Sequence, residues 1–181
     1  MGLNIAAASH LRYVGPMPSD EEWDRLEAEL EQQGKALFET YFPVEPNLSD
    51  YAAHLAGLQP GLYARTPETQ VHDFRVGPYS YYNGWRRHLC RFALGVPQEE
   101  VWVLPYRFQG QPFVELINFT DCDGRIGTTV AAKLAQDFRS HFARAEAFAH
   151  TLTTMEDWML IYVDFLTAFE LAAQDGALAF C

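Results

Sequence analysis

The sequence predicts a single α+β domain, spanning residues 1–181, in which a small antiparallel or mixed sheet packs against about four helices. The chain has 181 residues, of which 49% are hydrophobic and 20% are charged, and this composition suits one folded domain with an ordinary core. Several segments repeat apolar residues at helical spacing, whereas others alternate apolar and polar residues as strands do. Taken in chain order, these segments indicate an α+β layer arrangement.

The first part of the chain is predicted to begin with extended structure over residues 3–14 and to continue with a helix from Ser19. Ser19 has the capping-box spacing with Glu22, and apolar residues recur on one face of the segment that follows. Residues 41–68 contain four prolines and predict a long irregular connection with one short helix. Residues 70–76 alternate as a strand does.

The middle of the chain is predicted to contain a helix over residues 81–94, capped by Ser80, and then a hairpin. Residues 101–106 and 112–119 are its two expected strands, because a glycine-containing connection joins them. In the second strand Glu115 shares a face with apolar residues, which places a carboxylate on a buried surface. Such a carboxylate is either paired with a cation or held neutral, and either state marks a candidate functional residue.

The last part of the chain is predicted to hold two helices and a terminal strand. The first helix opens near Thr128, after which apolar residues recur every four positions. The second begins with Thr153 and Glu156, which have capping-box spacing, and is expected to end at a Gly176 cap. The apolar tail over residues 177–180 can add a short strand.

The charge of the chain is strongly negative and unevenly distributed. Asp and Glu number 24 against 13 Lys and Arg, a net charge of −11, which argues against nucleic-acid partners and against an anionic membrane surface. Residues 61–130 are the exception, with seven acids and seven arginines. An anionic group is therefore expected to find its favourable surface there. The arginines are Arg65, Arg75, Arg86, Arg87, Arg91, Arg107 and Arg125.

The cysteines and the amino-terminal residues predict a cytoplasmic protein without a cofactor. Cys90, Cys122 and Cys181 are odd in number and far apart, which argues against a disulfide framework and against a zinc site. The first residues have neither the basic region of a signal peptide nor the pattern for myristoylation, and no apolar run reaches the length of a membrane span.

A first polar segment lies where the predicted strand at residues 70–76 gives way to the predicted helix. Free backbone N–H groups at a helix start favour an anionic or polar ligand, and the tyrosine, tryptophan and arginine side chains offer stacking faces and a cation. The alternative is that these aromatic residues only pack in the core. The candidate ligand-binding residues are Tyr79, Ser80, Tyr82, Asn83, Trp85 and Arg86.

A second polar segment follows the predicted hairpin. Glu115, Asn118 and Asp121 are its candidate ligand-binding residues, and Glu115 is the candidate catalytic residue if the protein is an enzyme. Asp121 and Asp123 have the spacing of half a calcium loop, but the pattern is incomplete, so an Asx turn is favoured over a metal site.

These segments carry a resemblance to a family of small, uncharacterised proteins of bacteria and their phages. The family's matching segments are residues 1–5, 77–86, 113–124, 133–138 and 169–180, about two thirds of the chain. Asn4 stands where the family pattern has Asp. The resemblance brings no assigned activity, but it implies that the two polar segments come together, because they are its most recognisable parts.

Three functions are consistent with this sequence. The first is a non-catalytic protein, phage-related by the resemblance, that binds a small anionic or nucleotide-like ligand through the polar and aromatic residues above. The second is a hydrolase, in which Glu115 is the general base and Asp121 with Asp123 holds a metal or positions water. The third is an interaction module, in which the acidic helix over residues 19–33 meets a basic host protein.

Overall fold

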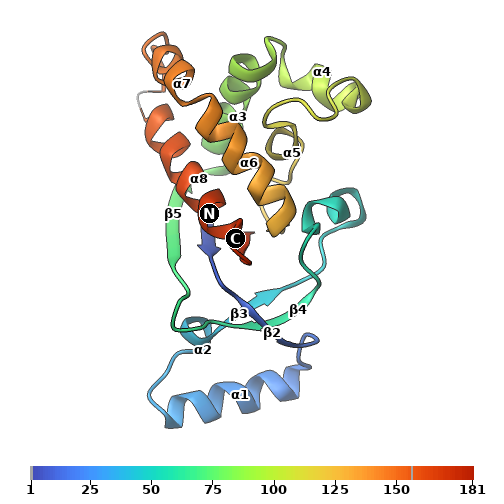
Figure 1. Ribbon diagram of the computed structural model, residues 1–181, viewed down its shortest axis with the longest axis vertical. Coiled ribbons are helices and arrows are strands. Elements are labelled where there is room, and N and C mark those ends of the chain that lie inside the picture. The colour runs from blue at the N-terminus through green and yellow to red at the C-terminus, as the bar shows by residue number, and fades with distance from the viewer. Residues whose placement is uncertain (1, 156) are drawn as a thin grey trace.

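The structure is a computed structural model that describes residues 2–155 and 157–181 (Figure 1). Four strands from distant parts of the sequence form its central sheet. All neighbouring strands are antiparallel, in the order β5-β1-β7-β6. Their bounds are Leu3–Ala8 (β1), Val71–Gly77 (β5), Gly124–Gly127 (β6) and Ala177–Phe180 (β7). The extended segments expected near the two ends of the chain and at residues 70–76 are confirmed, and β6 is a strand that the sequence pattern does not predict.

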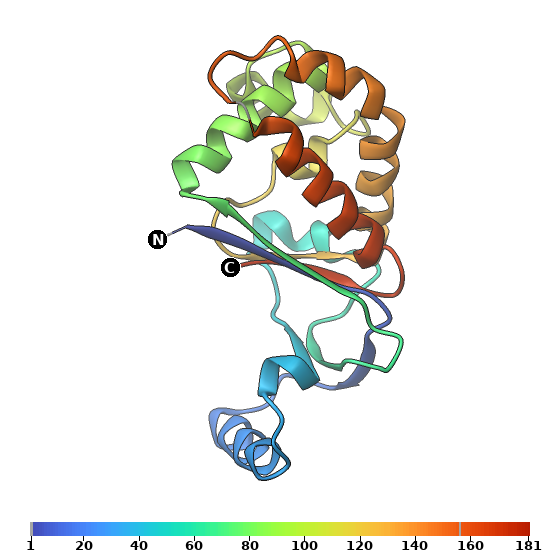
Figure 2. The same cartoon turned by 90° about the vertical axis from the view of Figure 1, so that its left-hand side faces the viewer.

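A layer of helices covers one face of this sheet (Figure 2). Alternate strand residues, such as Ile5 and Leu178, point into this layer and are almost completely buried. The helix predicted over residues 81–94 is confirmed, and so is the α+β class. The helices of the layer are α3 (Tyr79–Leu94), α6 (Thr128–Ser140), α7 (Phe142–Ala149) and α8 (Trp158–Ala172).

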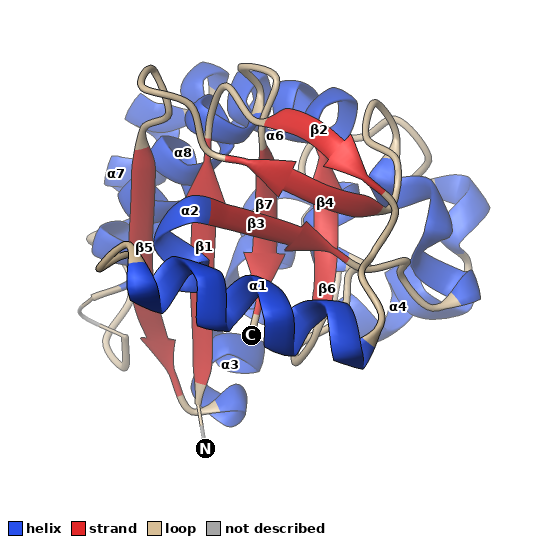
Figure 3. Cartoon of the chain, turned by 90° about the horizontal axis from the view of Figure 1, so that it is seen from below, coloured by secondary structure: helices blue, strands red, loops and turns tan. Residues whose placement is uncertain are grey.

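A second, three-stranded sheet lies against the other face, and its strands run across the direction of the central ones (Figure 3). Its order is β2-β4-β3, again antiparallel. The expectation of an irregular connection over residues 41–68 is therefore wrong, because β3 and β4 form there, although a short 3₁₀ helix (Ser49–Leu55) is confirmed. The bounds of the strands are Arg12–Gly15 (β2), Tyr41–Val44 (β3) and Gly61–Ala64 (β4).

The acidic helix predicted from Ser19 is α1 (Asp20–Gln32), and it is followed by the short α2 (Leu37–Thr40). Its capping box is present, since the Ser19 backbone N–H donates to Glu22 Oε2 at 2.8 Å. Leu30 is the residue of α1 that is buried, so the helix makes only a thin contact with the rest of the molecule.

The hairpin predicted over residues 101–119 is wrong. These residues instead form α4 (Gln98–Val103), a 3₁₀ turn (Pro105–Arg107) and α5 (Val114–Ile117). Phe113 has a left-handed backbone with φ of 61°, which interrupts any extended run before α5 begins. The apolar run is short, and periodicity alone does not separate a strand from a buried helical turn of that length.

Three predicted helix boundaries also need correction. Helix α3 begins after Pro78, so Ser80 is its second residue and not its cap. Helix α8 begins at Trp158, and the Glu156 half of the capping box expected before it lies outside the described residues. The positive φ after α8 belongs to Asp175 and not to Gly176. Of the helices within the described residues, none combines the length and the hydropathy needed to cross a membrane.

Candidate functional site

The two predicted polar segments meet in space and bond each other directly. Asn83, on α3, donates from Nδ2 to Asp121 Oδ2 at 2.6 Å. Arg86, one turn further along α3, donates from one terminal nitrogen to Asn83 Oδ1 at 2.6 Å and from the other to the Phe119 carbonyl. The chain after α5 is therefore fixed to α3 by three charged or amide side chains.

Arg86 is the centre of this contact. Its guanidinium is buried and lies over the rings of Tyr82 and Trp102, at 5.1 and 5.8 Å from their centroids. Gln98 and Trp102 donate in parallel to the Ile117 carbonyl, at 3.2 and 3.4 Å. Carbonyls at the end of α5 thus receive donors from both α3 and α4, as helix carboxyl ends require.

The aromatic candidates of the first segment belong mainly to the core. Tyr82 and Trp85 have no exposed surface, and Trp85 Nε1 donates to the Trp158 carbonyl at 3.0 Å. Burial raises the pKa of Tyr82 to about 12, so its hydroxyl stays protonated. Tyr79 is half-buried and Ser80 is exposed at the start of α3.

Glu115 does not join this contact. It lies in α5 and its Oε2 is 2.5 Å from Nζ of Lys133 on α6, which is also 2.9 Å from Asp137 Oδ2. The expected carboxylate on a buried strand face is therefore corrected to a half-buried carboxylate in an ion triad. Asn118, beyond the end of α5, keeps its Oδ1 buried and without a hydrogen-bond partner in the described part of the chain.

Asp121 and Asp123 turn to different partners. Asp121 bonds Asn83, whereas Asp123 Oδ1 lies 3.1 Å from a terminal nitrogen of Arg125. Across residues 2–155 and 157–181, no group of three or more His, Cys, Asp or Glu side chains is arranged to hold a metal ion.

A hollow is found on the other face of the central sheet, opposite the helices. The strand registers place Asp73, Ala6, Ala179 and Arg125 side by side on four neighbouring strands. The two alanines in the middle of this row pack against the cluster that contains Phe42 and Val44 of β3, but their side chains are short. The resulting cavity has a volume of about 260 Å³, and we call it the inter-sheet cleft.

The walls of the inter-sheet cleft are aromatic and basic. Phe38, Tyr41 and Phe42 come from α2 and β3, and Arg65 follows β4. Arg65 has a buried Nε without a hydrogen-bond partner in the described part of the chain, and it forms no ion pair there. The complete lining is Ala6, Phe38, Tyr41, Phe42, Pro43, Arg65, Asp73, Arg125, Ala179 and Cys181.

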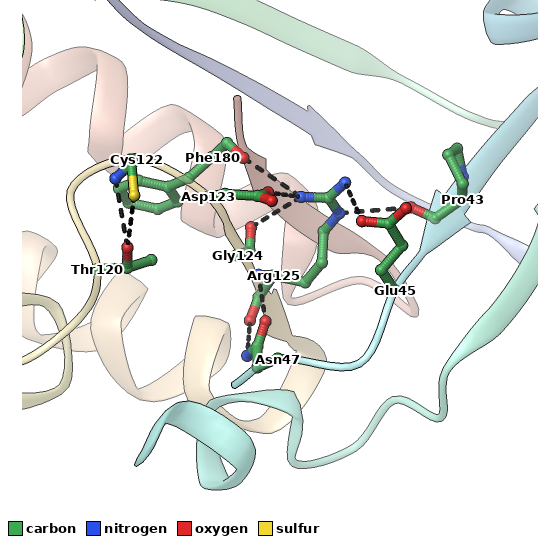
Figure 4. A network of polar contacts seen from close by, with 9 residues as sticks. All are labelled: Pro43, Glu45, Asn47, Thr120, Cys122, Asp123, Gly124, Arg125 and Phe180. Carbon is green, nitrogen blue, oxygen red and sulfur yellow. Dashed lines mark hydrogen bonds and ion pairs between the residues drawn. The ribbon is translucent and has the colours of Figure 1, made fainter. Parts of the chain in front are cut away.

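Arg125 is the residue that joins the two sheets beside this cleft (Figure 4). Its guanidinium donates to the Gly124 and Phe180 carbonyls at 3.1 and 3.2 Å and, across the gap, to the Pro43 carbonyl at 3.4 Å. Glu45 Oε2 lies 3.9 Å away. These contacts orient a mostly buried cation without closing the space next to it.

Two further cavities adjoin Arg125. One, of about 190 Å³, is lined by residues 45–48, by Thr120 and by residues 122–125. The other, of about 380 Å³, shares Phe38, Pro43 and Arg125 with the inter-sheet cleft and extends under α1 to Trp23. Arg125 therefore lies where three hollows converge.

The residues of this cleft are not among the candidates that the sequence motifs identify. The charge distribution includes Arg65 and Arg125 among the seven arginines of the neutral stretch, but it does not distinguish these two from the other five. Ala6 and Ala179 carry no sequence signal, since their importance depends on which strands become neighbours. Comparison of the chain with models of known families, with curated proteins and with solved structures found no match.

Proposed function

We propose that this chain is a non-catalytic binding protein whose inter-sheet cleft takes a small ligand with a flat ring and an anionic group. One observation carries the proposal, namely that Arg65, which forms no ion pair in the described part of the chain, lines the same cavity as Arg125. Two arginines suit a carboxylate or a phosphate, since each guanidinium offers parallel donors.

The shape of the inter-sheet cleft suits a ligand that contains a flat ring. Its floor is flat, because Ala6 and Ala179 are neighbours on a pleated sheet. Tyr41 and Phe42 supply aromatic surface on the opposite side. Asp73, at the far end of the row, offers an acceptor for a ligand N–H or hydroxyl group. A nucleotide-like ligand has all of these features in one molecule.

The proposal also places the protein in a reducing, cytoplasmic setting. All three cysteines are free, and Cys181 lines the cleft itself. Burial raises the pKa of the Cys181 thiol, so it stays protonated and does not compete as an anion for the arginines.

Calorimetric titration of the full chain tests this function with three probes: adenosine monophosphate, adenosine and inorganic phosphate. Adenosine monophosphate should bind saturably, and adenosine should bind at least about tenfold more weakly, because it lacks the group that meets the arginines. Arg65→Ala should remove the difference between the two. Arg91→Ala is the matched control, since it removes the same charge from an exposed position on α3.

Native mass spectrometry of the protein purified from cells provides the second measurement. We expect a co-purified small molecule that is lost from Arg65→Ala and retained by Arg91→Ala. The proposal fails if the protein carries no small molecule, none of the three probes binds, and an extract of the same cells leaves the melting temperature unchanged, because a ligand must stabilise the fold that binds it.

A further inference from the structure

We infer that a second copy of this chain docks along the free edge of β5, so that two central sheets join into one continuous antiparallel sheet. The two edges of the central sheet differ. At the β6 edge, the Asn47 side chain accepts from the Arg125 backbone N–H and donates to the Arg125 carbonyl, both at 2.7 Å. The β5 edge has no strand beside it within the described chain.

The backbone of β5 is arranged to pair on its outer side. The Ser9 N–H donates to the Gln70 carbonyl at 3.0 Å, and the Gln70 N–H donates to Ser9 Oγ at 3.0 Å, so these two residues face each other as a bonded pair and the antiparallel ladder alternates from there. By this alternation Val71, Asp73 and Arg75 turn their N–H and C=O groups away from β1. All three residues are exposed. The outer edge therefore presents a row of donors and acceptors over most of a seven-residue strand.

Charge selects the partner and the register. Pairing β5 with its own copy around Phe74 places Asp73 opposite Arg75 of the second copy, and this pair occurs twice by symmetry. Pairing around Asp73 or around Arg75 instead places two like charges opposite each other, which is unfavourable. Neither residue has an ion pair with another residue of the described chain. The strand is thus complementary to itself in one register.

The helix next to this edge presents an apolar strip on the same side. Helix α8 packs on β5 and β1, and His72 Nε2 lies 3.1 Å from Asp164 Oδ1, which fixes the helix above the strand. Leu160 and Val163, on α8, are 68% and 40% exposed. Figure 2 shows α8 and β5 facing the viewer together. A second copy placed by the two-fold axis at Phe74 would cover this strip along with the strand edge.

Sedimentation velocity on the full chain tests the inference through charge reversal. We expect the unmodified protein to sediment as a dimer, and Asp73→Arg or Arg75→Asp alone to raise the dimer dissociation constant by about tenfold or more, because each creates two like-charge pairs. The double variant D73R/R75D should restore the dimer, since it exchanges the charges within the same pairs. Arg91→Asp, which makes the same charge change on an exposed part of α3, should leave the dimer intact.

Hydrogen exchange gives a second readout that does not depend on a variant. The amides of Val71, Asp73 and Arg75 should become protected as protein concentration rises, whereas the outer face of α1 should not change. A protein that remains monomeric at the highest soluble concentration overturns the inference. A dimer that tolerates both single reversals, or that the double variant fails to restore, overturns it equally, because the interface then lies elsewhere or in another register.

Discussion

Asp73 and Arg125 lie at the two ends of one cross-strand row, with only Ala6 and Ala179 between them. Neighbouring strands are about 4.8 Å apart, so a carboxylate and a guanidinium separated by three such spacings do not bond each other. The two short side chains between them leave the inter-sheet cleft open. The inter-sheet cleft therefore has a charged side chain at each end of this row and an apolar floor between them.

Filling the floor of the cleft should abolish ligand binding while the fold survives. Ala6→Val adds two methyl groups to a half-buried strand position, and valine suits a strand. We expect adenosine monophosphate to bind at least about tenfold more weakly in calorimetry, with little change in the melting temperature, because the added volume occupies space that the ligand needs. Unchanged affinity would place the ligand outside the cleft.

Replacing Arg125 with lysine should destabilise the protein. Lysine cannot bond the Pro43, Gly124 and Phe180 carbonyls together, since it lacks the planar fork of donors. We expect a loss of about 1–3 kcal/mol in the free energy of unfolding, measured by urea denaturation. Arg91→Lys is the control and should have no effect; an equal loss in both would show that the contacts across the sheets contribute nothing.

Asn83 and Asp121 should be energetically coupled. Their 2.6 Å hydrogen bond holds the chain after α5 against α3. It also orients the Asn83 amide, whose Oδ1 accepts a hydrogen bond from Arg86. In a double-mutant cycle with Asn83→Ala and Asp121→Ala, we expect a coupling free energy of about 0.5–1.5 kcal/mol. If the losses in unfolding free energy of the two single variants simply add in the double variant, this hydrogen bond does not hold the two segments together.

His54 should make the protein less stable at mildly acidic pH. Burial lowers the pKa of its imidazole from the ordinary value of 6.5, although carbonyl contacts with Glu115 and Tyr51 partly oppose this. The folded protein then binds fewer protons than the unfolded chain in the range between the lowered value and 6.5. Stability is therefore full above that range and falls as pH decreases through it.

The variant His54→Gln isolates this effect, because glutamine can still donate to the Glu115 carbonyl that His54 Nε2 contacts at 2.9 Å. Its unfolding free energy should vary less with pH than that of the unmodified protein between about pH 5 and pH 7. Parallel pH profiles for the two proteins would exclude His54 as the source of the dependence.

Gly176 should tolerate no side chain. A Cβ added at this position would lie 2.0 Å from the Ala8 carbonyl oxygen, so the backbone of β1 or the chain entering β7 would have to move. We expect Gly176→Ala to cost more than about 2 kcal/mol in urea unfolding. At Gly15 an added Cβ meets nothing within 4 Å, so Gly15→Ala should change stability by less than about 0.5 kcal/mol.

Long amphipathic helices could be predicted from the sequence, whereas the secondary structure of short buried segments could not. The faces of α3 and α8 follow from apolar residues repeated over several turns, which only a helix brings together. The run around Glu115 is too short for such a test, and the left-handed backbone at Phe113 depends on surroundings that include Asp137, whose carboxylate accepts the Phe113 N–H at 2.9 Å.

The order of residues establishes which chemical groups are available: an acidic chain, a neutral arginine-rich stretch, and helices and strands that need a common core. The pairing of strands in three dimensions then selects which of these arginines share a cavity. Arg125 meets this hollow because four strands from residues 3–8, 71–77, 124–127 and 177–180 become neighbours in one register, and Arg65 meets it because β4, which Arg65 follows, belongs to the second sheet that lies on the same face. A hollow made by short side chains exists only once that register is set, since a single alanine leaves no space until its cross-strand neighbour is also small.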